Sequence, residues 1–230
     1  GPSAVEIQKI IEELEGLYDM TDEGDITDYL GVNVEKLPDG NISLTQPHLI
    51  EQVISLVNFQ PKTKSKPTPA SPSKILRKDE SAPPHKADWS YRQLIGKLNF
   101  LEKSTRPDIA YAVHQCARFS QSPRESHTEA ATRICKYLLG SRDKGLILNP
   151  TDHSFECYAD ADFCGLWEHA SCLEDPSTAK SRTGYVILYA GCPLIWASKL
   201  QGETALSTTE AEYIALSTAL RETIPMMNLV

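Results

Sequence analysis

Apolar residues recur along the chain at two spacings, and the order of these spacings predicts an α+β protein. Residues 4–18 place an apolar side chain at every third or fourth position, which is typical of an amphipathic helix. Residues 29–35 and 41–45 instead alternate apolar and polar side chains around Pro-Asp-Gly at 38–40. Because Pro presets φ and Gly accepts a positive φ, we expect a β-hairpin here.

Helical spacing returns after the hairpin and is then lost. Apolar residues over 49–57 share one side of a predicted helix, with Thr45 as its expected cap and Pro47 in its first turn. Residues 60–86 are rich in Pro, Ser and Lys, so we expect an extended connector. Its basic side chains fit either phosphate contact or a solvated linker. They are Lys62, Lys64, Lys66, Lys74, Arg77, Lys78 and Lys86.

Three more helices are predicted between residues 88 and 140. The first covers about 88–103. The second opens at Thr105 and the third at Ser122, in sequences that resemble capping boxes. Gly140 is suited to ending the third helix. Short connections between them predict a compact antiparallel bundle.

The C-terminal third changes back to β-rich sequence. Runs at 157–162, 183–191 and 193–198 predict three antiparallel strands, and a helix is expected to begin after Ser207. Such a sheet with one helix leaves a strand edge unpaired, which predicts pairing with a protein partner or a second copy.

Composition narrows the class of protein. The net charge of −8 and the pI near 5.3 argue against a strongly basic, nonspecific nucleic-acid binder, although a local basic face is compatible with them. No apolar run approaches the roughly 20 residues that cross a bilayer, so we expect no membrane partner. Six cysteines without a CxxC pair predict free thiols in an intracellular, reducing compartment.

Two groups of side chains suggest metal chemistry. Asp160 and Asp162 end the first of the β-rich runs, and Glu210 falls in the first turn of the helix after Ser207. Carboxylates converging from a strand and a helix provide the oxygen ligands of a Mg²⁺ site. The competing interpretation is that Asp160 is an ordinary strand-end residue and that Glu210 completes a capping box with Ser207.

A zinc site is the second possibility, and its spacing is poor. The candidate ligands lack paired CxxC spacing, so we expect ordinary free thiols instead. They are Cys157, Cys164, His169 and Cys172.

Seven ordered motifs make the chain resemble the polyprotein of Copia-type LTR retrotransposons over nearly its whole length. They are Tyr29-Leu-Gly-Val with Leu44-Thr-Gln46, Tyr91-Arg-Gln-Leu-Ile-Gly-Lys-Leu98, Thr105-Arg-Pro-Asp-Ile-Ala-Tyr-Ala-Val113, Tyr158-Ala-Asp-Ala-Asp162, Ser181-Arg-Thr-Gly-Tyr185, Trp196-Ala-Ser-Lys199 and Leu206-Ser-Thr-Thr-Glu-Ala-Glu-Tyr213.

The resemblance implies a division of the chain. Residues 1–3 look like a tag scar. Residues 4–60 look like the end of a reverse-transcriptase palm, whose hairpin is similar to a primer grip. Residues 61–87 form the connector, and 88–145 resemble a helical thumb. Residues 146–230 resemble a truncated ribonuclease H domain of three antiparallel strands plus a helix.

The resemblance also implies a site and its gaps. Asp160 matches the first-strand aspartate and Glu210 the first-helix glutamate of ribonuclease H, with Asp162 as a further candidate ligand and a third aspartate without a counterpart. The polymerase Asp-Asp motif is absent. We therefore expect weak Mg²⁺ or Mn²⁺ binding, no polymerase activity, and weak or no cleavage of RNA in RNA/DNA hybrids.

Two alternatives to an enzyme follow. The first is a domesticated or truncated derivative that keeps the fold as a non-enzymatic module binding nucleic acid or protein, and the second is a structural protein without a nucleic-acid role. An RNA/DNA hybrid or duplex is the partner that the resemblance implies, and basic residues on the thumb-like helices are the candidate contacts to its backbone. These residues are Arg92, Arg106, Arg118, Arg133 and Lys136.

Overall fold

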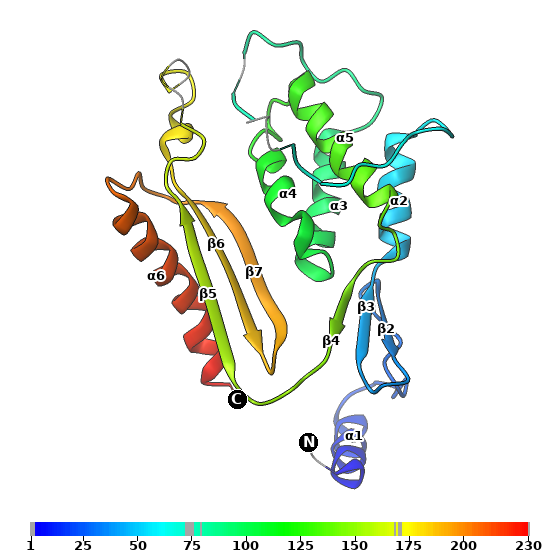
Figure 1. Ribbon diagram of the computed structural model, residues 1–230. Coiled ribbons are helices and arrows are strands. Elements are labelled where there is room, and N and C mark those ends of the chain that lie inside the picture. The colour runs from blue at the N-terminus through cyan, green and yellow to red at the C-terminus, as the bar shows by residue number, and fades with distance from the viewer. Residues whose placement is uncertain (1–2, 72–75, 79, 168, 170–171, 230) are drawn as a thin grey trace.

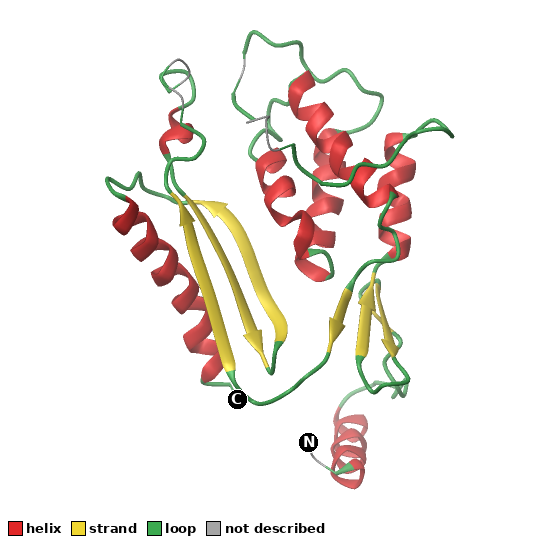
Figure 2. Cartoon of the chain, in the orientation of Figure 1, coloured by secondary structure: helices red, strands yellow, loops and turns green. Residues whose placement is uncertain are grey.

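The computed structural model describes residues 3–71, 76–78, 80–167, 169 and 172–229, and in these it is an α+β protein with two antiparallel sheets (Figure 2). A lobe of helices lies between the sheets in the sequence and beside both of them in space (Figure 1). The expected fold class is therefore confirmed at this level. Among the described residues, no helix is long and apolar enough to span a membrane.

The N-terminal sheet contains the predicted hairpin and two strands that were not expected there, because a turn at Leu30 and Gly31 divides the predicted strand at 29–35 and a strand at 146–148 joins the sheet. Its order is β1 (Asp28–Tyr29), β2 (Val32–Lys36), β3 (Ile42–Thr45) and β4 (Leu146–Leu148). The hairpin turn has Gly40 at φ 87°, a conformation that glycine adopts without strain. Residues of β4 were grouped with the C-terminal unit in the sequence, but β4 pairs with β3 instead, Ile42 opposite Leu148.

Gly145 explains how β4 approaches β3. A Cβ on this residue would lie 2.0 Å from the Leu44 carbonyl oxygen, so only glycine fits there. The helix before this sheet, α1 (Ala4–Leu17), agrees with the prediction in extent. None of its fourteen residues is buried, so its apolar stripe faces solvent.

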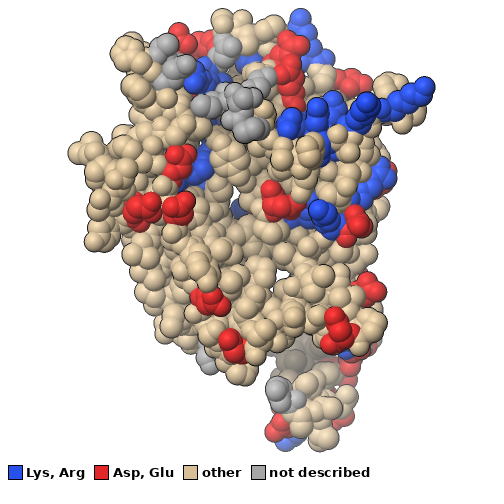
Figure 3. Space-filling model, in the orientation of Figure 1, with Lys and Arg blue, Asp and Glu red and all other residues tan. Residues whose placement is uncertain are grey.

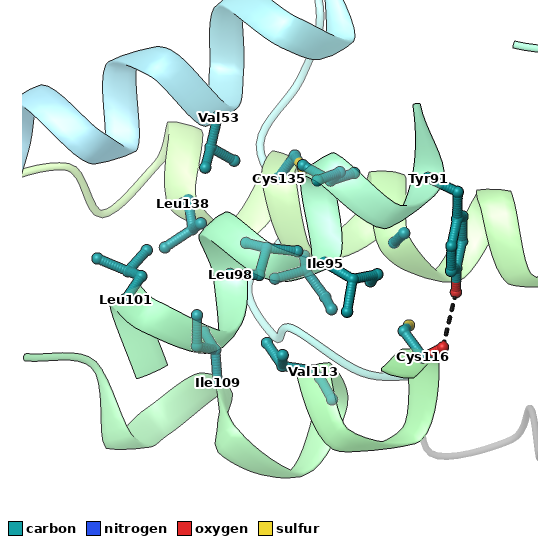
Figure 4. Close-up of a cluster of buried hydrophobic side chains, with 14 of the residues drawn as sticks. Val53, Tyr91, Ile95, Leu98, Leu101, Ile109, Val113, Cys116, Cys135 and Leu138 are labelled. Carbon is teal, nitrogen blue, oxygen red and sulfur yellow. Dashed lines mark hydrogen bonds between the residues drawn. The ribbon is translucent and has the colours of Figure 1, made fainter. Parts of the chain in front are cut away.

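Four helices and one 3₁₀ turn form the helical lobe. These are α2 (Pro47–Val57), α3 (Tyr91–Ser104), η1 (Pro107–Ile109), α4 (Ala110–Ala117) and α5 (Glu125–Leu139). Their apolar faces build one core, in which Leu98, Leu101 and Leu138 are fully buried (Figure 4). Tyr91 closes one end of it by donating a 3.0 Å hydrogen bond to the Cys116 carbonyl. Since α2 shares this core, it belongs structurally with α3, α4 and α5.

Three expected caps are wrong. Thr45 ends β3, and Gln46 precedes α2 without a side-chain cap. The hydroxyl of Thr105 donates to Gln46 Oε1 (2.9 Å), because both residues are buried at the junction of two helices. The helix expected from Ser122 begins at Glu125, where the Arg124 N–H donates to His127 Nδ1 (3.0 Å).

The connector between α2 and α3 packs against the helical lobe rather than extending into solvent. The Lys66 N–H donates to the Lys136 carbonyl of α5 (3.2 Å), and Leu76 and Trp89 are buried in the helical core. Only a single bridge, Pro84 with Arg124, gives regular pairing in its described residues. Most described residues of the connector are nevertheless exposed, including Lys62, Lys64, Lys66, Lys78 and Lys86, so phosphate contact and a solvated linker both remain open for them, and Lys74 lies outside the described residues.

The C-terminal sheet consists of the three predicted strands. They are β5 (Phe155–Asp162), β6 (Arg182–Tyr189) and β7 (Cys192–Leu200), in the order β5-β6-β7, followed by α6 (Thr208–Met227). A 3₁₀ turn, η2 (Pro176–Ala179), precedes β6. Ala211, Ala215 and Ala219 line the buried side of α6, and these small residues let it lie close along β5 and β6 (Figure 1).

Candidate functional site

The candidate carboxylates come from two elements that meet at one end of the C-terminal sheet. Asp162, Arg182 and Leu200 lie across from one another at this end. Buried Gln201 then fixes the start of α6 there, since its Nε2 donates to the Ala211 carbonyl (2.9 Å) and to Thr183 Oγ1 (3.1 Å). The end of β5 and the first turn of α6 are thereby held at the same edge.

Strand alternation decides which way the aspartates face. Phe155, Cys157 and Ala159 pack on the side of the sheet that α6 covers. Asp160 and Asp162 have the opposite parity and are exposed, so they lie on the face that α6 leaves open. The structure therefore confirms that the two aspartates share a face, and it separates that face from α6.

Glu210 is engaged at the start of its own helix. Its Oε2 accepts a 2.6 Å hydrogen bond from the Leu206 N–H, and its own N–H donates to Ser207 Oγ (3.1 Å). Ser207 is the N-cap, as predicted. Both contacts satisfy backbone and side-chain groups at a helix N-terminus, which is the capping interpretation of this residue.

Asp162 is turned toward the loop that follows β5. A Cβ built on Gly165 would lie 2.1 Å from Asp162 Oδ1, so the carboxylate occupies the space that any larger residue at 165 would need. The Asp162 carboxylate is therefore exposed to solvent on one side and lies against the loop at Gly165 on the other.

The arrangement does not fit a complete two-metal centre. In the described part of the chain, no three His, Cys, Asp or Glu side chains gather as a group able to hold a metal ion. Two divalent ions side by side need several carboxylates, because hard oxygen ligands must offset their mutual repulsion. The possible zinc ligands form no such group among the described residues either: Cys164 Sγ donates to the Ala179 carbonyl, and Cys172 Sγ donates to the His169 carbonyl.

Arg106 is not available to a nucleic-acid backbone, contrary to expectation. Its guanidinium is 1 % exposed and donates to Asp108 Oδ1 (2.9 Å) and Oδ2 (2.8 Å). Further donations go to the carbonyl and the hydroxyl of Ser141 (both 2.8 Å), and the Tyr137 hydroxyl donates to Asp108 (2.7 Å). Arg106 thus joins the start of η1 to the end of α5, and these contacts with its guanidinium and Tyr137 hold the pKa of Asp108 below its usual value despite burial, which opposes them.

Arg118 is also held within the protein. It donates to Ser177 Oγ (2.6 Å) and Gln115 Oε1 (2.9 Å) and lies 3.7 Å from Asp175. Asp175 in turn accepts from the Lys78 N–H of the connector (3.0 Å). This cluster joins α4, the connector and the segment before β6, so its role in the structure is to hold three segments together.

The other three basic candidates stay at or near the surface. Arg92 is exposed on α3, and Lys136 is half-buried on α5. Arg133 donates to the Thr68 hydroxyl (2.8 Å) and carbonyl (3.2 Å), which attaches the connector to α5. These residues remain candidates for contact with phosphates.

Sequence reasoning missed Arg182 and Gln201 as organising residues of this region. Both are buried polar side chains, 5 % exposed in each case. Arg182 lies within the motif Ser181-Arg-Thr-Gly-Tyr185, which was used only as a resemblance. Gln201 follows β7 in a stretch without periodicity, and nothing in its sequence context signals that it is buried.

Comparison with known proteins defines the class. No protein-family model matches the chain, and no solved structure matches it. It is 34 % identical over 224 residues to a transposon Ty5-1 protein of Saccharomyces cerevisiae, covering 96 % of this chain and 69 % of that protein. It is 33 % identical to the retrovirus-related Pol polyprotein from transposon TNT 1-94 of Nicotiana tabacum, and 30 % identical to that from transposon RE1 of Arabidopsis thaliana.

These relatives are transposon proteins, in agreement with the resemblance that the ordered motifs indicate. The chain belongs to the Copia-type retrotransposon Pol polyproteins. The match to the tobacco polyprotein includes 95 % of this chain but only 16 % of the polyprotein. The match to the Arabidopsis polyprotein includes 94 % of this chain and 14 % of the polyprotein. The activities of those whole polyproteins are therefore proposals for this chain.

Proposed function

We propose that this chain binds an RNA/DNA hybrid or duplex, as the end of a reverse-transcriptase palm and a thumb joined to part of a ribonuclease H-like domain. The distribution of charge carries the proposal. Residues 61–145 hold 17 of the 23 Lys and Arg and 8 of the 31 Asp and Glu, so this part of the sequence has a formal charge of +9 while the chain has −8. A nucleic-acid backbone is attracted to such a region even on an acidic protein.

The space-filling view supports a local basic face. In Figure 3, Lys and Arg side chains gather over the part of the molecule where the helical lobe and its connector lie, whereas the lower part shows mainly acidic and uncharged residues. A thumb that follows a duplex needs this kind of surface, because phosphate contacts position the nucleic acid without reading its sequence.

Cleavage of RNA in a hybrid is proposed to be weak or absent in this chain. Asp160 and Asp162 share an exposed face, and Glu210 is occupied at its helix start. These carboxylates would bind Mg²⁺ or Mn²⁺ at millimolar concentration at best, as at the poorest oxygen-ligand sites. Polymerisation is not proposed, since the sequence lacks the Asp-Asp motif.

Fluorescence anisotropy with a labelled RNA/DNA hybrid tests the proposal. Binding is expected to weaken linearly on a logarithmic salt scale. Arg92→Gln and Lys136→Gln should each reduce affinity and lower the salt slope by about one. Lys36→Gln is the matched control, because Lys36 lies on β2 paired with Asp25, away from the basic region. Equal affinity in all variants, or binding insensitive to salt, would contradict the proposal.

A protein-interaction module is the second candidate. β5 ends the C-terminal sheet in the described strands, with β6 as its only neighbour there, so its other edge offers unpaired backbone groups. α6 also exposes Tyr213, Leu216 and Ile224. Light scattering over a range of protein concentrations tests self-association, and a constant monomeric mass together with hybrid binding would favour the first candidate.

A further inference from the structure

Arg182 is a buried cation whose donors are only partly used. It stands at the start of β6 and is 5 % exposed, on the face of the sheet that meets α4. Its Nη1 has three long contacts: His114 Nδ1 (3.3 Å), the Ser198 carbonyl (3.2 Å) and Ser198 Oγ (3.4 Å). The guanidinium lies 5.1 Å from the ring centre of Tyr111. Its Nε and Nη2 are buried without a hydrogen-bond partner.

An unpaired buried guanidinium is costly. Arginine cannot lose its proton to escape burial, and a buried charge is normally paired and hydrogen-bonded on every donor. Arg106 in the same chain shows the satisfied case, with a bidentate aspartate and two serine acceptors. Arg182 thus has donors in the geometry that suits an oxyanion, and no acceptor on two of them.

Asp162 is the nearest acidic candidate on the same strands and does not fill this role. It lies opposite Arg182 in the β5–β6 pairing. Its carboxylate, however, lies against Gly165, and no hydrogen bond or ion pair joins it to Arg182 in the described structure. The acceptor that Arg182 requires is therefore not supplied by its cross-strand neighbour in this conformation.

The surroundings of Arg182 favour an anion. Burial lowers the pKa of the His114 imidazole to about 4. The nearby positive charges of Arg182, Arg118, Lys103 and Lys199 contribute to the same shift. A cavity of about 440 Å³ reaches the two residues that hold Arg182 Nη1, His114 and Ser198, and Lys103 and Lys199 also line it.

Two acidic residues line the same cavity. Burial raises the pKa of Glu102, which favours its neutral form. Glu222 adds one negative charge against the two lysines. The lining therefore carries two lysines and two glutamates, and Arg182 beside it adds one positive charge.

We propose that the seam between α4, β6 and β7 is a phosphate-binding site, in which the guanidinium of Arg182 binds a phosphoryl oxyanion with help from Ser198 and Lys103. Arg182 does not itself line the cavity, so its long Nη1 contacts to His114 and Ser198 must open before its unused donors can meet an anion there. The phosphate comes from the backbone of the nucleic acid proposed above or from free phosphate. Only the first source rests on the proposed function.

The first experiment uses inorganic phosphate and the full chain. Thermal unfolding is followed with increasing sodium phosphate, with ionic strength held constant by sodium chloride. Phosphate should raise the unfolding midpoint of the natural chain. Arg182→Lys keeps the charge and loses the planar fork, and should weaken phosphate binding roughly tenfold or more. Arg182→Met should abolish it, and Arg142→Gln, at a surface ion pair with Glu51, should leave it unchanged.

Asp162→Asn separates the two possible partners of Arg182. If an external anion is the partner, removing the neighbouring negative charge strengthens phosphate binding. If Asp162 turns to Arg182 in solution, phosphate has no specific effect on the natural chain and acquires one only in Asp162→Asn, which overturns the proposal. Equal phosphate effects in the natural chain and in both Arg182 variants overturn it as well.

The second experiment repeats the anisotropy titration with the RNA/DNA hybrid. Weaker hybrid binding by Arg182→Lys, alongside weaker phosphate binding, identifies the backbone as the source. Loss of phosphate binding alone assigns the site to free phosphate and leaves the hybrid proposal to stand on Arg92 and Lys136. If neither the natural chain nor any variant binds the hybrid, the proposed function is wrong. The phosphate-binding result is independent of that outcome.

Discussion

The indole Nε1 of Trp196 donates a 2.8 Å hydrogen bond to the main-chain carbonyl of Glu102, and so joins β7 to the last turn of α3. The carbonyl is one that the helix leaves free, because the Arg106 N–H turns to Leu101 instead. A side chain of the C-terminal sheet thus satisfies a helix end in the other lobe.

Replacing Trp196 by Phe should therefore loosen the two lobes. The substitution keeps an aromatic ring and removes the donor, and we expect a loss of about 1 kcal/mol in the free energy of unfolding. Urea unfolding measures it. Trp167→Phe is the control, since Trp167 is 53 % exposed and should change stability by less than about 0.5 kcal/mol. Equal effects of the two substitutions would show that the hydrogen bond contributes nothing.

Arg106 and Arg92 should separate stability from binding. Arg106→Met leaves Asp108 and Ser141 without their buried partner, and we expect about 3 kcal/mol of destabilisation in urea. Arg92→Gln removes an exposed charge and should change stability by less than about 0.5 kcal/mol. If Arg106→Met unfolds at the same urea concentration as the natural chain, the network around Arg106 is not structural.

Protonation of His114 should weaken the fold in mild acid. Burial and the surrounding cations hold its pKa at about 4, below the ordinary 6.5. Between pH 4 and 6.5, His114 is therefore protonated in the unfolded chain but neutral in the folded chain. Above pH 7 the imidazole is neutral in both states, so it causes no destabilisation there. Stability falls as the pH drops from about 6.5 to 4, by at most about 1.4 kcal/mol per pH unit, and then levels off.

Urea unfolding at pH 7, 6 and 5 tests this dependence in the natural chain and in His114→Gln. Carboxylates titrate in both proteins, so the difference between the two isolates the histidine. The natural chain should lose more stability than the variant over this range. Parallel losses would show that His114 is protonated in the folded state as easily as in the unfolded one.

Glu210 distinguishes a helix cap from a metal ligand. Glu210→Ala removes the acceptor of the Leu206 N–H and should cost about 1 kcal/mol in the free energy of unfolding, whether or not Mg²⁺ is present. Asp160→Asn should leave stability nearly unchanged, because that side chain is exposed. A destabilisation by Glu210→Ala that appears only with millimolar Mg²⁺ would instead support a shared ion.

The sequence predicted most of the elements because their patterns are local. The alternation around Gly40 located the hairpin, and the carboxylate-bearing strand, the two strands that follow it and the Ser207 cap were all found as expected. These features depend on residues within one turn or one strand of each other, so periodicity and capping preferences suffice to predict them.

What the sequence did not predict depends on contacts between distant segments. Arg106 follows Thr105 in a stretch that suggests an exposed cap, yet its partners at Ser141 and Tyr137 come from the end of α5. Tyr213 is 68 % exposed although it is a large aromatic residue, because Ala211 and Ala215 take the buried side of α6. Only the packed structure shows which face of a helix is covered. It also shows which arginine forms an ion pair with an acidic side chain.

The pairing of β4 with β3 also orders events during synthesis. Ile42 and Leu148 are partners across about a hundred residues of chain. When the hairpin leaves the ribosome, the outer edge of β3 has no strand to pair with. This edge stays unpaired until the whole helical lobe and residues 146–148 of β4 have been translated. A nascent chain arrested before Gly145 would therefore carry a folded bundle beside an incomplete first sheet.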